Sequence, residues 1–274
     1  MQLNFDQIKK DLHEKGYAVV KGIFDKKEIN YLDTVLETMH KKNNYARSIT
    51  GLHRHKEYWD IISNEKIKNL VSKIYDKEFF YLYNSQSHWQ NDVPAVEWHR
   101  DNPCRRFGIG PDWDKKEEYN VLRFAVYLSP IEHKTGLNVI PYSHKKKYQI
   151  SSLLRVIHLR LKKYKSINKF RNLFHKITGK NIYTDQGDCI LFFANLIHGA
   201  LPTLKDRKNI ISSFGIKNKH SENYMNYFYA HRGSEGFAFK DSEQNIKNEF
   251  SKYIKDKGLY CPMPEKKNDI EGAY

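Results

Sequence analysis

Two histidines and one aspartate in this chain have the residue types and spacing of metal ligands. His99 and Asp101 are two positions apart, so in an extended segment both side chains point to the same side and can reach one ion. A third residue of suitable type, His198, lies far downstream. Two imidazoles and one carboxylate on one face leave half of an octahedral site open, and this set suits Fe(II) and also Mn(II), Co(II) or Zn(II). His99, Asp101 and His198 are therefore the candidate metal ligands and catalytic residues.

Each of these residues has a simpler explanation when it is taken alone. A His-x-Asp sequence also occurs in surface loops, and a histidine that leaves a buried strand beside a glycine, as His198 does, can be an ordinary core residue. The neighbours of the first motif favour a metal site over a chance occurrence of His-x-Asp, because Trp98 would shield one side of the site and Pro94 and Pro103 bracket the loop.

Arg207 adds a group that can bind a carboxylate. It follows His198 by nine positions, at the start of a predicted strand over 209–217. A short hairpin through Pro202 would place it beside His198 in an antiparallel pair. A guanidinium there offers two parallel hydrogen bonds to a carboxylate, whereas an isolated arginine could equally form a surface salt bridge.

The composition is that of a globular protein. The 274 residues are 39% hydrophobic and 14% aromatic, enough for one large domain with a real core or two small ones. The longest apolar runs are too short to span a bilayer, and no signal peptide is visible. Three widely spaced cysteines suggest neither a disulfide framework nor a structural zinc site. We therefore expect a soluble cytoplasmic protein without a transmembrane segment.

The net charge of +15 has two interpretations. It can indicate an anionic partner, such as a phosphorylated or carboxylated substrate, nucleic acid or an acidic membrane surface. It can also reflect the base composition of the genome, and this is favoured because the lysines are scattered without a recognition run. We expect a small-molecule substrate, with a mild preference for an anionic one, rather than nucleic acid.

Hydrophobic periodicity predicts helices first and many short strands afterwards. Asn4 and Asp25 are the predicted caps of the first two helices. This order argues for an α+β chain with a β-sandwich or barrel core in a single domain over residues 1–274. The predicted helices are 5–15, 26–42, 64–76, a basic insertion at about 151–177 and a charged tail helix after 241; the predicted strands are 17–24, 79–87, 122–129, 188–193 and 209–217, with a loop at 91–114.

Several ordered segments resemble the phytanoyl-CoA dioxygenase family of Fe(II)/2-oxoglutarate-dependent oxygenases. The resemblance extends over nearly the whole chain, from an opening strand through the first metal motif to the second histidine and the arginine. The segments are 16–24 (GYAVVKGIF), 98–101 (WHRD), 122–130, 136–145 (GLNVIPYSHK) and 187–199 followed by Arg207.

The resemblance implies a double-stranded β-helix (jelly roll, cupin-like) with flanking N-terminal helices and a helical insertion. It assigns His99, Asp101 and His198 as iron ligands and Arg207 as the anchor for the far carboxylate of 2-oxoglutarate. Fe(II) would be the cofactor, with 2-oxoglutarate and O2 as co-substrates, and a substrate C–H bond would be hydroxylated with release of succinate and CO2. Related halogenases lack the carboxylate ligand, so the presence of Asp101 favours hydroxylation over halogenation.

Three features depart from the family pattern. Tyr142 stands where glycine is usual, and Ala200 stands where some members have a hydroxyl that helps to bind the co-substrate. The segment at 151–177 is longer than the simplest members need. The first two departures leave the metal site intact, and the third is expected to shape the substrate entrance.

Further polar residues fall on predicted inward-facing positions of strands. Tyr83 and Gln86 are expected to contact the co-substrate, and Arg123, Tyr127 and Asn138 the substrate. The alternative for each is a polar residue inside the barrel whose hydrogen bonds are satisfied by a neighbour.

Three other functions are compatible with the sequence. A catalytically inactive metal-binding jelly roll would not need the intact triad and arginine. A basic polyanion-binding protein is suggested by the net charge and by the segment at 151–177. A zinc hydrolase with the same ligands would leave Arg207 without a role. No sequence feature fixes the substrate or the oligomeric state.

Overall fold

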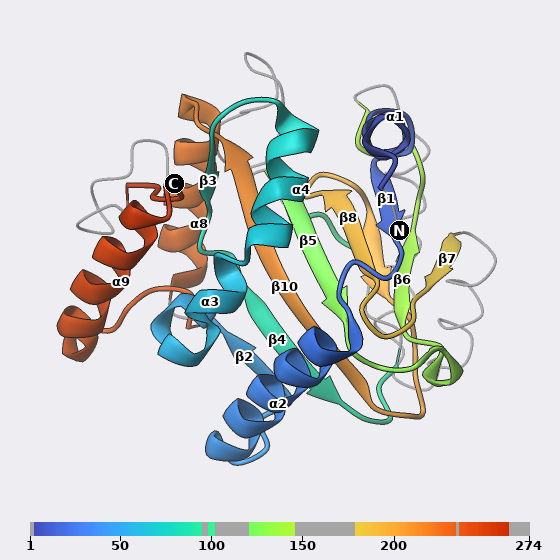
Figure 1. Cartoon of the computed structure of the whole chain (residues 1–274), viewed down its shortest axis with the longest axis horizontal. Coiled ribbons are helices and arrows are strands. Elements are labelled where there is room, and N and C mark those ends of the chain that lie inside the picture. Colours follow the sequence, from blue (N-terminus) through green and yellow to red (C-terminus); the bar gives the residue numbers. More distant parts are fainter. Residues whose placement is uncertain (1–2, 95–97, 102–120, 146–178, 234–235, 263–274) are drawn as a thin grey trace.

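Two antiparallel sheets and the helices around them form the described part of the chain (Figure 1). The computed structural model describes residues 3–94, 98–101, 121–145, 179–233 and 236–262. Within these ranges the larger sheet has the order β1-β8-β5-β10-β4-β2, and β3 pairs with β10 beside this path. Its strands are β1 (Tyr17–Val20), β2 (Ser48–Thr50), β3 (Phe79–Tyr81), β4 (Gln86–Gln90), β5 (Val121–Tyr127), β8 (Cys189–Phe193) and β10 (Arg207–Ile216).

A smaller sheet packs against one face of the larger sheet. Its order is β7-β6-β9, and an isolated bridge between His99 and His198 adds the first metal motif beside β9. Apolar side chains from both sheets form one buried cluster, in which Ala125 of β5 and Leu137 of β6 take part. Burial of these two faces holds the sandwich together and confirms the predicted α+β jelly-roll class. The strands are β6 (Gly136–Val139), β7 (Lys180–Tyr183) and β9 (His198–Ala200).

Helices cover the opposite face of the larger sheet. The second and larger apolar cluster joins this face to the helices. Side chains alternate along β5, so Ala125 belongs to the cluster between the sheets, while Phe124 and Val126 belong to the cluster under the helices. The helices are α1 (Phe5–Lys15), α2 (Lys26–Lys42), α3 (Trp59–Ile62), α4 (Glu65–Tyr75), α8 (Lys219–Arg232) and α9 (Gln244–Asp256), with short 3-10 turns η1 (Leu52–Arg54), η2 (Lys56–Tyr58), η3 (Ile131–His133) and η6 (Asp241–Glu243). None of the described helices is long and apolar enough to cross a membrane.

The N-terminal helices and their caps agree with the sequence. The Asn4 side chain accepts a bond from Gln7 N, and Asp25 forms a reciprocal capping box with Glu28. Such caps depend on residues three positions apart, so they can be predicted before any tertiary contact is known. The helices predicted at 5–15, 26–42 and 64–76 are confirmed as α1, α2 and α4.

Other element boundaries differ from the predictions. The strand predicted at 79–87 is two strands, because the chain turns between β3 and β4 with Tyr83 at a φ of 57°. The first strand ends at Val20 instead of residue 24, since a turn with Gly22 at a φ of 54° follows. Helix α8 was not predicted. The insertion predicted at 151–177, much of the loop at 91–114 and the end of the tail lie outside the described residues.

Candidate metal centre and the adjoining pocket

The three candidate ligands converge from two distant parts of the chain. One ligand atom from each of His99, Asp101 and His198 lies within 4.8 Å of the others. Asp101 Oδ1 is 3.4 Å from His99 Nε2, and Oδ2 is 3.8 Å from His198 Nε2. The backbone bridge between the two histidines brings their ring centroids to 4.4 Å. Three donor atoms are therefore grouped around one small space.

His198 is oriented by its own turn. Its Nδ1–H donates to Leu196 O at 3.0 Å, which leaves Nε2 unprotonated and directed toward Asp101. Burial, together with the nearby His99, lowers the pKa of His198 to about 4. The imidazole is therefore neutral near pH 7, which is the form that ligates a metal.

Arg123 holds the Asp101 carboxylate. Its Nε lies 2.9 Å from Asp101 Oδ2, and the same guanidinium donates to Asn84 O at 2.6 Å and to Ser213 Oγ. Burial alone would raise the pKa of Asp101, but the positive charge of Arg123 outweighs it and holds the pKa well below its ordinary value. Arg123 was predicted to contact the substrate, and the structure places it against a candidate ligand.

The backbone of Asp101 is fixed as well. Its N–H donates to Ala194 O at 2.7 Å, and its carbonyl accepts a bond from Tyr224 Oη at 3.1 Å. The Asn84 side chain donates in turn to Tyr224 Oη at 3.1 Å. Arg123 and Tyr224 are therefore both hydrogen-bonded to Asn84. Between them they restrain Asp101 at its carboxylate and at its main chain.

A small pocket adjoins the three ligands. Its volume is about 160 Å³, and all three ligands are among its lining residues. Period-2 alternation along the strands directs every second side chain toward it. Besides the ligands, its polar lining comes from Gln86, His88 and Gln90 of β4, Arg123 and Tyr127 of β5, and Arg207 and Asn209 of β10.

Arg207 contributes a buried positive charge to this pocket. Its side chain donates to Leu201 O at 3.0 Å and to Gln90 Oε1, while its buried Nε has no hydrogen-bond partner among the described residues. Only 3% of Arg207 is exposed, so the surface salt bridge considered for it is wrong. A buried guanidinium with an unused donor is suited to an anion that enters the pocket.

Arg207 reaches the pocket by a different route from the one predicted. His198 lies on β9 of the smaller sheet, and Arg207 pairs with Gln90 across β10 and β4 of the larger sheet. The intervening residues pass between sheets, so the predicted antiparallel hairpin is wrong. Proximity in this case comes from the packing of the two sheets against each other.

Comparison with a family model decides the relationship. A model of the phytanoyl-CoA dioxygenase (PhyH) family matches residues 12–209, which contain all three ligands and Arg207. The chain belongs to the phytanoyl-CoA dioxygenase family. The resemblance inferred from the ordered motifs is thereby confirmed, and so is the enzyme class, a non-haem Fe(II)/2-oxoglutarate-dependent oxygenase. No curated protein matches the sequence.

Solved structures share the fold of this PhyH-family chain at low identity. One is HygX from Streptomyces hygroscopicus with nickel and 2-oxoglutarate bound, with a TM-score of 0.61, 16% identity, and coverage of 79% of this chain and 88% of that chain. Another is EctD from S. alaskensis with 2-oxoglutarate and 5-hydroxyectoine, with a TM-score of 0.56, 17% identity, and coverage of 77% of this chain and 75% of that chain. AviO1 from Streptomyces viridochromogenes Tue57 has a TM-score of 0.55 and 16% identity, and the match covers 79% of this chain and 97% of that chain. These similarities establish the fold.

The other predicted binding residues of the PhyH-family chain divide into two groups. Gln86 and Tyr127 line the pocket. Tyr83 does not; its ring lies 5.0 Å from that of His53, and its hydroxyl donates to Cys261 O at 3.3 Å. Asn138 is fully buried, accepts a bond from Trp98 Nε1 at 2.6 Å and donates to Asn181 at 2.5 Å. The pocket geometry thus gives no support to a binding role for Tyr83 or Asn138.

Sequence reasoning missed several residues of the site. His88 and Gln90 were overlooked because the predicted strand ended at residue 87, whereas β4 continues to Gln90. The alternation Gln86, His88, Gln90 was the available signal. Asn209 was within a predicted strand but was not singled out, and Tyr224 belongs to the helix α8 that was not predicted.

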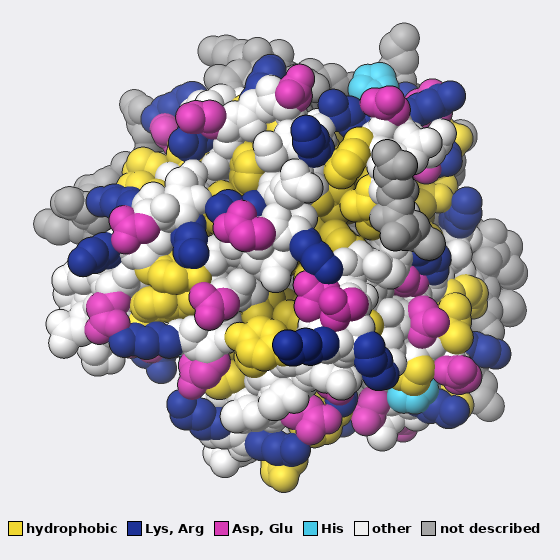
Figure 2. All heavy atoms as spheres, in the orientation of Figure 1, with side chains coloured by type: hydrophobic (Ala, Val, Ile, Leu, Met, Phe, Trp, Pro, Cys, Tyr) yellow, Lys and Arg dark blue, Asp and Glu magenta, His cyan; other side chains and the backbone are white. Residues whose placement is uncertain are grey.

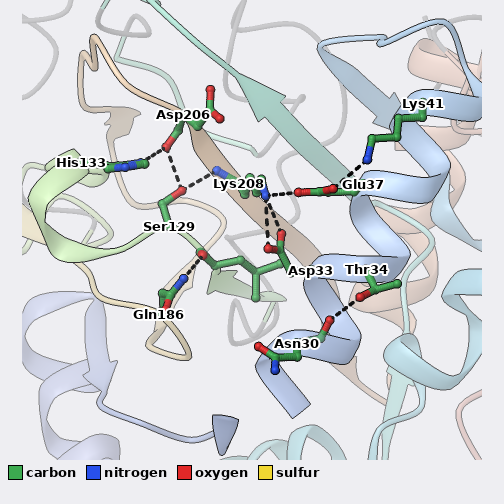
Figure 3. A network of polar contacts seen from close by, with 11 residues as sticks. Asn30, Asp33, Thr34, Glu37, Lys41, Ser129, His133, Gln186, Asp206 and Lys208 are labelled. Carbon is green, nitrogen blue, oxygen red and sulfur yellow. Dashed lines mark hydrogen bonds and ion pairs between the residues drawn. The ribbon is translucent and has the colours of Figure 1, made fainter. Parts of the chain in front are cut away.

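A polar network around Lys208 joins strand β10 to helix α2 (Figure 3). The Lys208 side chain extends toward α2, where its Nζ lies 2.9 Å from Asp33 Oδ1 and 2.6 Å from Glu37 Oε1. Its backbone N–H donates to Ser129 Oγ at 2.8 Å. Lys208, which directly follows Arg207, therefore connects β10 to helix α2.

Proposed function

We propose that this chain is an Fe(II)- and 2-oxoglutarate-dependent dioxygenase that hydroxylates a C–H bond of a small molecule and releases succinate and CO2. The observation that carries the proposal is that one pocket contains both the His99–Asp101–His198 group and the buried Arg207. A metal-only site would need no buried guanidinium beside it. A dicarboxylate that reaches from a metal to an arginine needs both.

The donor set fits Fe(II). Two imidazoles and one carboxylate, grouped within 4.8 Å, are the ligands of a facial triad that leaves open positions. His198 is held in the tautomer that presents Nε2, and Asp101 is held ionised by Arg123. Bound iron would supply the centre at which the 2-oxo acid and O2 react.

Arg207 would bind the far carboxylate of 2-oxoglutarate. Its bonds to Gln90 and Leu201 O preset the guanidinium, so little side-chain entropy is lost when the anion enters. Burial raises the pKa of Tyr127, so its hydroxyl keeps its proton, and it has no hydrogen-bond partner among the described residues. Tyr127 and Gln86 are therefore available as further donors in the same pocket.

The ligand set favours hydroxylation over halogenation. Asp101 fills the position that halogenases leave open for halide, and Arg123 with Tyr224 restrains it there. The orientation of substrate and the exclusion of water are then the tasks of the protein, while the metal supplies the oxidising chemistry. EctD, which shares this fold, was solved with 2-oxoglutarate and 5-hydroxyectoine, and this supports a small-molecule substrate.

The surface does not favour a polyanion-binding protein. Figure 2 shows Lys and Arg interspersed with Asp and Glu on the face that it presents. Many described lysines are paired with acids, among them Lys41 with Glu37 and Lys66 with Glu28. We therefore retain a small-molecule substrate, with only the mild preference for an anionic one that the net charge gives, and do not propose nucleic acid as the partner.

Anaerobic titration with Fe(II) and 2-oxoglutarate tests the proposed function. The protein should develop the visible charge-transfer band of a 2-oxo acid chelated to iron, and it should form succinate when O2 is admitted. An intact, iron-loaded protein that gives neither band nor succinate would remove the proposal and leave an inactive metal-binding protein as the explanation. A zinc hydrolase would bind metal without any response to 2-oxoglutarate.

A further inference from the structure

One polar residue of the pocket has no role in the function proposed so far. His88 lies in the middle of β4, between Gln86 and Gln90 on the face that lines the pocket. Across the strands it stands opposite Asn209 of β10 on one side and Ser48 of β2 on the other. Arg207, opposite Gln90, is its diagonal neighbour and is within the reach of a long side chain.

A chain of hydrogen bonds leads from Arg207 to His88. Arginine has only donors, so Gln90 must turn Oε1 toward Arg207 and its amide nitrogen away from it. That nitrogen lies 3.3 Å from Ser48 Oγ, to which it donates. Ser48 Oγ lies 2.6 Å from His88 Nδ1. While this hydroxyl accepts the bond from Gln90, it can also donate its own proton to Nδ1.

Donation from Ser48 Oγ to Nδ1 would select one tautomer of His88. With Nδ1 as acceptor, the proton of the neutral ring is on Nε2, the remaining polar atom of a residue that lines the pocket. Burial, with the charge of Arg207 next in size, lowers the pKa of His88 to about 3. His88 is therefore a neutral donor beside a charged one.

We propose that His88 is a second anchor of the far carboxylate of 2-oxoglutarate, donating from Nε2–H to the anion that Arg207 holds, and that Ser48 sets its tautomer. This inference rests on the proposed function. A carboxylate has two oxygens that can each accept more than one bond, so Arg207 alone does not satisfy it. An Nδ1–H tautomer would instead direct a lone pair at the anion and repel it.

Binding of two matched ligands tests the role of His88. Substitution His88→Leu should raise the Kd of the iron-loaded protein for 2-oxoglutarate about tenfold in anaerobic calorimetry, the loss of one charge-assisted hydrogen bond. The Kd for 2-oxopentanoate, which has the same carbon chain and no far carboxylate, should not change. Equal affinity of wild type and variant for 2-oxoglutarate, or equal weakening of both ligands, would overturn the proposal. Failure of the wild type to bind 2-oxoglutarate would instead overturn the proposed function.

The tautomer is measured separately and needs no variant to fold. In ¹⁵N NMR of the wild type, the His88 ring should have a protonated Nε2 and an unprotonated Nδ1. Ser48→Ala should lose this preference and raise the Kd for 2-oxoglutarate a few-fold without changing that for 2-oxopentanoate. A wild-type ring protonated on Nδ1 would contradict the assignment, as would a Ser48→Ala protein with unaltered tautomer and affinity.

Discussion

Asp101 is restrained at both ends, and this restraint matters more to the site than the residue type alone. Arg123 holds the carboxylate through Oδ2, and Tyr224 holds the backbone carbonyl. Both of these partners also bond to Asn84. A ligand that is already fixed loses little freedom when a metal binds, so the contacts around the site are expected to influence metal affinity.

Removal of the carboxylate ligand is the most direct test at this scale. Asp101→Ala should lower succinate formation at least about 100-fold, because one of three metal ligands is lost. Fe(II) affinity, measured by anaerobic titration, should fall in parallel while circular dichroism stays unchanged. An Asp101→Ala protein that retains turnover would show that the ligand assignment is wrong.

Tyr142 carries backbone strain at a position where the family usually has glycine. Its φ is 67°, a conformation that costs a residue with a Cβ roughly 1–2 kcal/mol. Because the Tyr142 side chain has contacts of its own, the informative comparison is between two variants that both lose it. Tyr142→Gly should be more stable than Tyr142→Ala by about 1 kcal/mol in urea unfolding. Equal stability of the two variants would mean that the backbone there is unstrained.

At the scale of elements, β10 connects the site to the helical layer. Arg207 faces the pocket, and Lys208 faces α2 because side chains alternate along a strand. The Lys208 side chain is only 13% exposed. Burial would lower the pKa of Lys208, but the carboxylates of Glu37 and Asp33 outweigh it and raise the pKa.

Loss of this ion pair should loosen α2 from the sheet. Lys208→Met removes the buried cation that Asp33 and Glu37 share and leaves only the exposed Lys41 beside Glu37, so the free energy of unfolding should fall by about 2 kcal/mol. Lys41→Met, which removes an exposed partner of the same Glu37, is the matched control. It should change the free energy of unfolding by less than about 0.5 kcal/mol. Similar losses in the two variants would contradict a special role for Lys208.

The elements that could be predicted are those with local signals. Helices α1, α2 and α4 have caps and one-sided apolar spacing within their own sequence. The break between β3 and β4 and the separation of β9 from β10 have no such signal, because they depend on which sheet each strand joins. The hairpin prediction failed for that reason.

For the whole molecule, His53 joins distant segments in one aromatic cluster. It is fully buried, and neither ring nitrogen has a hydrogen-bond partner among the described residues. Its ring lies 5.0 Å from Tyr83 and 5.7 Å from Phe250 of α9. Burial, with the charge of Arg54, lowers the pKa of His53 to about 3.

Stability should therefore decline as the pH falls below the ordinary histidine range. The unfolded chain gains a proton on His53 near pH 6.5, and the folded chain does not until about pH 3, so protonation favours unfolding between these values. Between pH 7 and pH 5 this residue should account for a loss of about 2 kcal/mol.

Urea unfolding at the two pH values measures this contribution. His53→Leu should lose about 2 kcal/mol less than the wild type on going from pH 7 to pH 5. His13→Leu, at an exposed position of α1, should behave as the wild type does. The same pH dependence in wild type and His53→Leu would contradict a neutral, buried His53.

The sequence by itself determined the ligand types, their order, the family and the capped helices. These follow from residue identity and from interactions between positions a few residues apart. The tertiary structure decided that Arg123 restrains Asp101, that Arg207 enters from the other sheet, and that His88 joins the pocket while Tyr83 and Asn138 do not. The physical reason is that two sheets packed face to face bring together strands remote in sequence, and their register fixes which side chains point inward.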